Sequence, residues 1–321
     1  MVRSLVLERK FLPLKNNLLM VLGPTASGKT RLGVELAREL GGEIVSADSR
    51  QVYRGLDIGA GKDLEEYSLG GPPVPYHLID IVDLDVEFNV FDFQKAFFEI
   101  FVELEARGTT PIVVGGSGLY LKSILSDTRM VEVPEEAGLR AELEGEATEK
   151  LIERLRGLRT VHNTTDLEDR GRLVRAIEIA EYSATHEPEP LPEISALVLG
   201  IRWDRRVLRE RIAKRLAERL REGLIEEVQR LHDAGVSWEK LEFLGLEYRF
   251  VSEFLRGVIK NENDLRQKLA SAIGSFAKRQ DTWFRRMERQ GTVIHWIEGG
   301  DLESALRVLA VHDDLAPGRP G

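Results

Sequence analysis

Two hydrophobic periodicities alternate along the first third of the chain. Short apolar runs at Leu18 to Leu22, Glu43 to Ser46 and Pro111 to Val114 are typical of buried strands. Between them, residues 31–40 and 91–107 repeat apolar positions with the period of an α-helix. This alternation predicts a parallel α/β sheet, in which the loops that follow the strands meet at one edge.

The pattern changes beyond Pro134. Charged helical segments at 139–155 and 172–182 end in a proline-bearing stretch near Pro192, which predicts an inserted helical lobe. Alternation at 194–201 then predicts a strand, residues 206–231, 250–257 and 263–287 predict helices, and residues 293–297 predict a last strand at the sheet edge.

These patterns predict five parts, of which the tail is expected to be partly disordered because its end is rich in proline and glycine. The parts are an N-terminal extension (1–17), an α/β core (18–130), the inserted helical lobe (131–192), the remainder of the core with C-terminal helices (193–300) and a C-terminal tail (301–321).

Composition narrows the class of protein. A chain of 321 residues with 42% hydrophobic and 31% charged residues is typical of a soluble globular protein. No secretory signal or membrane-length apolar run is present, so a cytoplasmic protein without a membrane partner is expected. The absence of cysteine excludes disulfides, cysteine zinc sites and thiol catalysis. The net charge of −9 counts against a uniformly basic surface, but basic clusters at 202–221 and 278–289 remain compatible with a polyanion.

A Walker A sequence, GPTASGKT, lies between the first strand and the first helix. Its spacing turns backbone N–H groups inward at a helix N-terminus, the lysine adds a charge, and the threonine hydroxyl can hold Mg²⁺. The loop therefore predicts a P-loop NTPase-like fold and a nucleotide or diphosphate site. Its residues are Gly23, Pro24, Thr25, Ala26, Ser27, Gly28, Lys29 and Thr30.

Asp48 ends the second strand, so its carboxylate is expected at the phosphate-binding edge, as a general base or a water-mediated Mg²⁺ ligand. The alternative is a helix N-cap. The third strand ends in GGSGLY, and it carries no acid of the kind that activates water in many P-loop ATPases. A nucleotide-hydrolysing motor is therefore disfavoured, although GGSGLY alone could be a structural turn.

Arginine pairs recur at helical spacing. Arg211 and Arg215 share one helix face and can clamp a diphosphate or a nucleic-acid backbone, and Arg172 with Arg175 invites the same interpretation. Ion pairing with Glu210 or Glu218 is the alternative for the first pair. Residues 276–286 interleave basic and aromatic side chains, as in nucleic-acid grooves, although the aromatic residues could belong to the core.

Eight motifs occur in the order expected of tRNA dimethylallyltransferases, and the similarity covers residues 18–297. The motifs are GPTASGKT, SADSRQVYRGLDIGAGK, YHLIDIVD, FDFQ, GGSGLY, EDRGRLVRAIE, RIAKRLAERLREGLIEEV and AKRQDTWFR. The resemblance implies that dimethylallyl diphosphate is the donor. It also implies that the acceptor is a flipped-out adenosine 3′ to the anticodon, in tRNAs that read codons beginning with U. The exocyclic amine of this adenosine would attack the allylic carbon of the donor while diphosphate leaves.

The resemblance also implies residue roles. Asp48 matches the family's base, Lys29 and Arg215 neutralise the departing diphosphate with Arg211 as a second candidate, and Mg²⁺ lies near Thr30. The anticodon stem-loop of tRNA is the expected partner of a monomeric protein. The implied tRNA contacts are Asp48, Ser49, Arg50, Gln51, Ser117, Gly171, Arg172, Leu173, Val174, Arg175, Lys278 and Arg279.

Two departures from the family pattern stand out. Gly171 occupies the place of a usual glutamine, and residues 245–248 read GLEY where many members have Gly-Tyr. Together with HNTTD at 162–166, GLEY resembles a second-copy bacterial subgroup. The competing functions are an adenylate isopentenyltransferase acting on a free nucleotide, a P-loop small-molecule kinase or nucleotide-hydrolysing switch, and a non-catalytic tRNA-binding protein.

Overall fold

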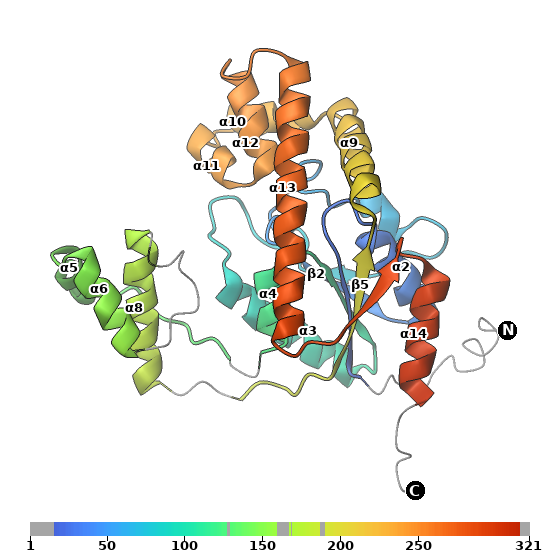
Figure 1. Cartoon of the computed structure of the whole chain (residues 1–321), viewed down its shortest axis with the longest axis horizontal. Coiled ribbons are helices and arrows are strands. Elements are labelled where there is room, and N and C mark those ends of the chain that lie inside the picture. Colours follow the sequence, from blue (N-terminus) through green and yellow to red (C-terminus); the bar gives the residue numbers. More distant parts are fainter. Residues whose placement is uncertain (1–15, 127–128, 159–166, 168, 187–189, 315–321) are drawn as a thin grey trace, which may run out of the picture. The chain divides into compact units, whose positions relative to one another are not determined.

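The computed structural model describes residues 16–126, 129–158, 167, 169–186 and 190–314. The chain forms two compact units (Figure 1). The first unit comprises the chain up to Leu125 together with the chain from Pro192 onward, and the second comprises Ser126–Leu191. Among the described residues, no helix combines the length and the apolar character needed to cross a membrane.

A six-stranded parallel sheet forms the centre of the first unit, in the order β3-β2-β4-β1-β5-β6. Strands β1 and β4 are buried along their whole length, which explains their continuous apolar sequences. The predicted parallel α/β fold is therefore confirmed. The strands are β1 (Leu18–Leu22), β2 (Glu43–Ala47), β3 (Tyr76–His77), β4 (Pro111–Gly115), β5 (Ala196–Arg202) and β6 (Ile294–Glu298).

Helices cover the sheet. Helix α2 (Lys29–Leu40) shares an apolar cluster with the strands, and helix α14 (Leu302–Asp314) adds Ala305, Leu306 and Leu309 to that cluster. Residues 302–314 of the expected tail therefore form a helix, in which regularly spaced apolar side chains bury one face. Residues 1–15 and 315–321 lie outside the described residues.

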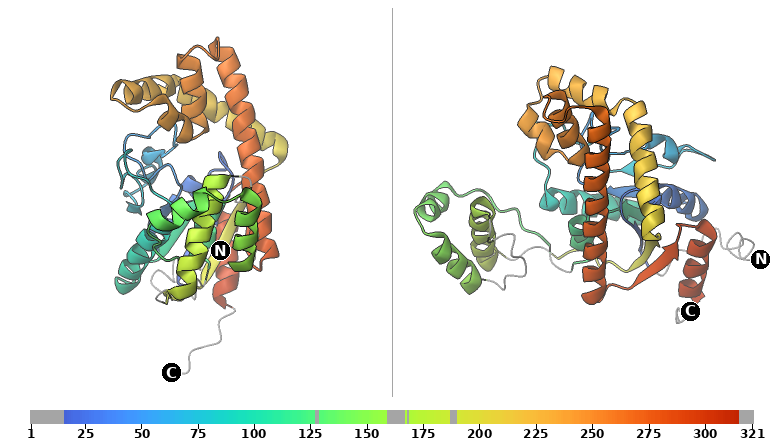
Figure 2. Two further views of the ribbon diagram at one scale, coloured as in Figure 1. Left: turned by 90° about the vertical axis from the view of Figure 1, so that its left-hand side faces the viewer. Right: turned by 45° about the horizontal axis from the view of Figure 1, so that its top comes forward.

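Helices α3 (Val90–Ala106) and α4 (Gly118–Ile124) pack on each other, and α4 also contacts α13 (Glu262–Arg289). Helix α13 is the long helix that the views of Figure 2 show beside the sheet. The other C-terminal helices, which pack with α13 around a second apolar cluster, are α9 (Arg205–Arg221), α10 (Leu224–Asp233), α11 (Trp238–Phe243) and α12 (Leu246–Leu255).

The second unit contains α5 (Ala137–Glu144), α6 (Thr148–Leu158) and α8 (Arg170–Thr185) around buried leucines and Ile177. The helix predicted at 139–155 is split into α5 and α6. Gly145 ends α5, and Arg170 donates to the carbonyl oxygens of Leu143 and Glu144 at 2.9 Å each.

The helix predicted at 206–231 in the first unit is also split, into α9 and α10. Gly223 adopts a left-handed φ of 103° between them.

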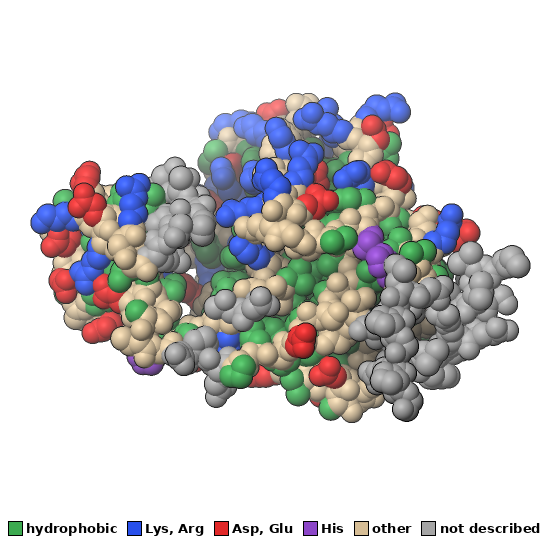
Figure 3. All heavy atoms as spheres, turned by 60° about the horizontal axis from the view of Figure 1, so that its bottom comes forward, with side chains coloured by type: hydrophobic (Ala, Val, Ile, Leu, Met, Phe, Trp, Pro, Cys, Tyr) green, Lys and Arg blue, Asp and Glu red, His purple; other side chains and the backbone are tan. Residues whose placement is uncertain are grey.

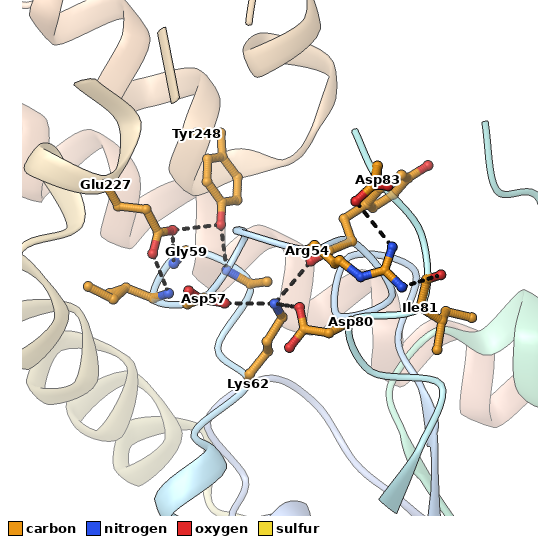
Figure 4. Close-up of polar contacts among 12 residues, drawn as sticks. Arg54, Asp57, Gly59, Lys62, Asp80, Ile81, Asp83, Glu227 and Tyr248 are labelled. Atoms are coloured by element: carbon orange, nitrogen blue, oxygen red, sulfur yellow. Dashed lines mark hydrogen bonds and ion pairs between the residues drawn. The ribbon is translucent and has the colours of Figure 1, made fainter. Parts of the chain in front are cut away.

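The segment after β2 is fixed over the sheet edge by buried polar contacts (Figure 4). The Glu227 carboxylate accepts hydrogen bonds from Ile58 N at 2.7 Å, Gly59 N at 3.0 Å and the Tyr248 hydroxyl at 2.8 Å. The Tyr248 hydroxyl also accepts from Ala60 N at 3.1 Å. Two side chains from α10 and α12 therefore satisfy three backbone donors of this segment.

The buried side chain of Lys62 also holds this segment in place. Its buried Nζ donates to Tyr53 O at 3.0 Å and Asp57 Oδ1 at 2.7 Å, and it pairs with Asp80. A buried ammonium is tolerated only when such partners replace its water. The segment therefore reaches the short helix η1 (Leu64–Tyr67) in a fixed conformation.

We predict that Tyr248→Phe lowers the free energy of unfolding by about 1–2 kcal/mol, because Ala60 N loses its acceptor and Glu227 loses a donor. Urea denaturation measures the loss. Tyr76→Phe, which changes a 40% exposed tyrosine, is the matched control and should alter stability little. Equal stability of the two variants would contradict a structural role for the hydroxyl.

Candidate active site

A cavity of about 660 Å³ opens at the carboxyl edge of the sheet in the first unit. The P-loop, the segment after β2 and helices α9, α12 and α13 line it. Thirteen of the predicted site residues meet there: Thr25, Ala26, Gly28, Lys29, Thr30, Asp48, Ser49, Arg50, Gln51, Ser117, Arg211, Arg215 and Arg279. Gly23, Pro24 and Ser27 are buried parts of the P-loop.

The P-loop connects β1 to α2 through a tight turn. Ser27 N donates to Pro24 O at 3.2 Å, while Ala26 and Gly28 have left-handed φ angles of 60° and 90°. Gly28 occupies the N-cap of α2 and brings no side chain to cap it. The N–H groups at this helix start are therefore available to a bound anion.

Gln280 ties the P-loop to the turn after β4. Its Oε1 accepts from Thr25 N at 2.8 Å, and its Nε2 donates to Gly116 O at 3.0 Å. A Cβ at Gly116 would collide with this amide, so the glycine permits the close approach of α13. Gln280 is missing from the predicted site residues, although it lies inside the AKRQDTWFR motif.

Two side chains hold the carbonyl side of the P-loop. Arg211 Nε donates to Ala26 O at 2.8 Å, and Trp203 Nε1 donates to Ser27 O at 2.9 Å. The Arg211 guanidinium lies 4.4 Å from the centroid of the Trp203 ring. Burial, with repulsion from Arg215, lowers the pKa of Arg211. Arg211 therefore supports the loop as well as lining the cavity.

Arg211, Arg215 and Arg219 follow one another at intervals of four residues along α9, and we call them the arginine ladder. Arg215 pairs with Asp63. Arg219, with a side chain only 8% exposed, lies 3.5 Å from Glu247 Oε1 and 4.0 Å from Asp63 Oδ1. Sequence reasoning missed Arg219, although the four-residue spacing continues to it.

The alternative of surface ion pairing fails for the first two arginines of the ladder. Glu210 lies 4.0 Å from Arg206, and Glu218 lies 3.9 Å from Lys214, so both acids pair with other exposed side chains. The guanidinium groups of Arg211 and Arg215 instead face the P-loop and the segment after β2.

Lys29 lies beside the arginine ladder, and its pKa is lowered. Burial, followed by repulsion from Arg215, lowers the pKa of Lys29 from 10.5 to about 8, against the opposing attraction of Asp48 and Asp63. Its Nζ has a weak contact with Pro24 O at 3.5 Å. An anion bound in the cavity would stabilise the charged form of Lys29.

Asp48 faces the cavity from the end of β2. Its Oδ1 accepts from Arg50 N at 2.9 Å, and residues 49–55 form turns, so Asp48 does not cap a helix. Gln51 has a structural part: it accepts from Ser46 Oγ at 2.7 Å and donates to Gly61 O at 2.9 Å. Arg50 donates to Phe243 O at 3.0 Å.

Thr30 and Asp48 are among the hydroxyl and carboxylate groups that the cavity offers to a cation. Among the described residues, no group of three or more His, Asp or Glu side chains is arranged to hold a metal by itself. This set fits Mg²⁺, which is commonly bound by one or two protein groups together with substrate phosphates.

The remaining predicted tRNA contacts lie elsewhere. Lys278 is an exposed residue of α13 that does not line the cavity. In the second unit, Gly171 and Arg172 are exposed and Val174 is half-buried, whereas Leu173 is fully buried in the apolar core. Residues 162–166 of the HNTTD motif lie outside the described residues.

Arg175 is committed to its own unit. It donates to Val133 O at 2.7 Å and to Glu178 Oε2 at 3.1 Å. Glu178 is buried, and Arg140 also binds it at 2.8 Å. The hydrogen bonds of both arginines lower the pKa of Glu178 against the opposing effect of burial.

Comparisons with known proteins agree with this geometry. The family model described as IPP transferase matches residues 51–287. The tRNA dimethylallyltransferase 1 of Geotalea uraniireducens is 60% identical over 299 residues, which cover 92% of this chain and 98% of that protein. The tRNA dimethylallyltransferase 2 of Syntrophotalea carbinolica is also 60% identical, with coverages of 91% and 98%. Because relatives named dimethylallyltransferase 1 and dimethylallyltransferase 2 are equally similar to this chain, the identities do not assign the chain to a second-copy subgroup.

A solved structure is similar over nearly its whole length. The full-length tRNA isopentenylpyrophosphate transferase from Bacillus halodurans aligns with a TM-score of 0.65 and 31% identity, covering 94% of this chain and 96% of that one. A eukaryotic dimethylallyltransferase acting on tRNA aligns with a TM-score of 0.74 at 22% identity, and this likeness concerns the fold alone.

We predict that affinity for inorganic diphosphate falls by about tenfold per pH unit above pH 8, relative to a Lys29→Met variant. The affinity falls with rising pH because diphosphate binding requires the charged ammonium of Lys29, which the free protein loses as the pH rises through about 8. Calorimetry of both proteins from pH 7 to 10 measures it. The variant reports the ligand's own ionisation, and parallel pH profiles would contradict the role of Lys29.

Proposed function

The chain belongs to the IPP transferase family, and we propose that it transfers a dimethylallyl group from dimethylallyl diphosphate to tRNA, with release of diphosphate. The acceptor is the exocyclic amine of the adenosine 3′ to the anticodon in tRNAs that read codons beginning with U. The observation that carries this function is a single cavity in which the P-loop and arginine ladder face Asp48.

The leaving group determines most of the chemistry. As the allylic carbon–oxygen bond breaks, negative charge accumulates on the departing diphosphate. Once the donor is bound, the N–H groups at the start of α2, Lys29 and Arg215 face that charge and need not reorganise during the reaction, which is the condition for strong transition-state stabilisation. The P-loop therefore serves as a diphosphate-leaving site, and no phosphoryl group is transferred.

Asp48 is the proposed proton acceptor. Its carboxylate lies at the cavity wall, where the turn contact to Arg50 N fixes its orientation. The amine nitrogen of adenine attacks as the allylic carbon becomes positive, and it becomes acidic as the new carbon–nitrogen bond forms. A nearby carboxylate can then accept the proton.

Mg²⁺ is proposed as the cofactor, with the Thr30 hydroxyl as its protein-side partner and Asp48 as a partner through water. When bound, the ion would neutralise part of the diphosphate charge. Lys29 and the arginine ladder supply the remaining positive charge from the chain itself.

The tRNA partner is supported by residues outside the cavity floor. Arg50, Ser117 and Arg279 line the cavity, and in Figure 3 Lys and Arg side chains gather over the region of the first unit that carries α9 to α13. The exposed Gly171 and Arg172 of the second unit are proposed as additional contacts. One chain carries every proposed catalytic group, which supports a monomer. A cytoplasmic location is proposed as well, since tRNA is the acceptor.

The kinase and free-nucleotide alternatives do not explain the basic residues outside the cavity floor. β4 ends in Gly115 and carries no acid of the kind that activates water, which disfavours a nucleotide-hydrolysing protein. A small-molecule kinase would use the P-loop and Asp48 but would leave the basic helices unexplained. A free mononucleotide would not need the exposed basic residues of α13 or of the second unit.

The function is tested with purified protein, Mg²⁺ and isotopically labelled dimethylallyl diphosphate, offered unmodified tRNA, AMP or ATP in separate reactions. Label should enter tRNA alone and map to the adenosine 3′ to the anticodon. Incorporation into AMP without incorporation into tRNA would overturn the proposal.

Asp48→Asn is expected to lower the rate of prenyl transfer by about 100-fold or more, because the amide cannot accept the amine proton. In calorimetry without Mg²⁺ the variant should still bind diphosphate, since the P-loop, Lys29 and Arg215 are unchanged and the amide oxygen can still accept from Arg50 N. Single-turnover kinetics and calorimetry separate the two quantities. Unaltered turnover would remove Asp48 from the mechanism.

Arg172→Ala and Arg175→Ala should differ in kind. Arg172 is exposed, so its loss should weaken tRNA binding and reduce the slope of log affinity against log salt by about one. Loss of Arg175 should destabilise the second unit by about 1–2 kcal/mol, because buried Glu178 loses a donor. Filter binding across salt concentrations and thermal melts measure both. A reduced slope without destabilisation in Arg175→Ala would contradict the structural assignment.

A further inference from the structure

The central arginine of the ladder already has an anionic partner. Arg215 pairs with the carboxylate of Asp63, and the two side chains are 28% and 32% exposed, so solvent reaches the pair from the cavity. In the proposed function Arg215 faces the departing diphosphate. The same guanidinium therefore has two possible anionic partners.

Asp63 pairs with Arg215 and does not cap the helix that follows it. It occupies the N-cap position of η1, where aspartate usually caps, yet its side chain makes no capping hydrogen bond. Its φ of 46° lies in the left-handed region, which costs energy for a residue other than glycine. Neither feature is explained by the stability of η1 itself.

The preceding segment brings Asp63 to the ladder. Gly61, at a φ of 63°, packs so closely on Arg219 that a Cβ there would collide with its guanidinium. The contacts of Lys62 and the Glu227–Tyr248 pair fix this segment from the other side. Asp63 is therefore positioned by buried neighbours, while its own carboxylate stays accessible from the cavity.

The charge around the ladder explains the need for such a group. Burial first, and repulsion from Arg215 second, lower the pKa values of both Lys29 and Arg211. Arg219 is buried with its Nε lacking a hydrogen-bond partner in the described part of the chain. Asp63 is the carboxylate that both Arg215 and Arg219 approach.

We propose that Asp63 is an anionic placeholder, which occupies Arg215 while the cavity is empty and is displaced from it by the diphosphate group. After the reaction Asp63 competes for Arg215 again, and this competition promotes release of the diphosphate product. The inference rests on the proposed function for the identity of the ligand, but its physical content is diphosphate binding alone.

The opposite interpretation gives the opposite sign. If Asp63 orients Arg215 toward the ligand, removal of its charge weakens diphosphate binding. If Asp63 is a competitor, removal strengthens binding. The sign of one affinity change therefore separates a placeholder from an orienting residue.

The test compares wild type with Asp63→Asn in the full chain, using inorganic diphosphate in calorimetry. Asparagine accepts a left-handed φ as readily as aspartate, so the variant should fold. We expect diphosphate to bind about fivefold more tightly, the scale of one partly exposed ion pair. In steady-state prenyl transfer, the KM for the donor should fall and inhibition by product diphosphate should strengthen, whereas kcat should not rise.

Two control variants make the result specific. Glu66→Gln removes a cavity-lining carboxyl that makes no ion pair within the described residues and acts on Arg215 and Lys29 only through space, so its gain in affinity should be clearly smaller than that of Asp63→Asn. In an Arg215→Ala background, the further change Asp63→Asn should have little effect, because the pair is already broken.

Several outcomes would overturn the inference: weaker or unchanged diphosphate binding in Asp63→Asn, an equal gain in Glu66→Gln, or an undiminished gain without Arg215. These results are independent of the acceptor. Tighter diphosphate binding in a protein that prenylates no tRNA would support the placeholder and refute the proposed function, and the reverse combination would do the opposite.

Discussion

The architecture of the site depends on positive charge concentrated where α9 meets the P-loop. Arg211, Arg215 and Arg219 share one face of that helix, beside the partly buried Lys29. Like charges in such proximity destabilise the ligand-free protein. They are tolerated because the carbonyl of Ala26 and the carboxylates of Asp63 and Glu247 face them. The structure thereby keeps a preorganised place for a multiply charged anion.

The polar contacts around the anion site hold its walls in position. Gln280 fixes both the P-loop and the turn after β4, so α13 sets the distance between two walls of the cavity. Glu227 and Tyr248 fix the segment after β2, which carries Asp48 at its start. Each support is a buried, hydrogen-bonded group, and its burial restricts movement of the side chains that face the ligand.

Local sequence signals were sufficient for much of this picture. Apolar runs predicted five of the six strands, and the P-loop spacing placed Lys29 and Thr30 correctly at the cavity. Gln280, Arg219 and Glu227 were missed because their roles depend on contacts between residues far apart in the chain. The helix of residues 302–314 was missed because its apolar face is satisfied only by α2 and the sheet. The burial of Leu173 and the pairing of Arg175 likewise follow from tertiary packing.

The central claim is that the P-loop stabilises a departing diphosphate and transfers no phosphoryl group. It is tested most directly by the fate of the oxygen that bridges carbon and phosphorus in dimethylallyl diphosphate. With oxygen-18 at that position and tRNA as acceptor, mass spectrometry should find all of the label in released diphosphate, because the carbon–oxygen bond breaks. Label retained in an organic product would show cleavage between oxygen and phosphorus, and it would contradict the account.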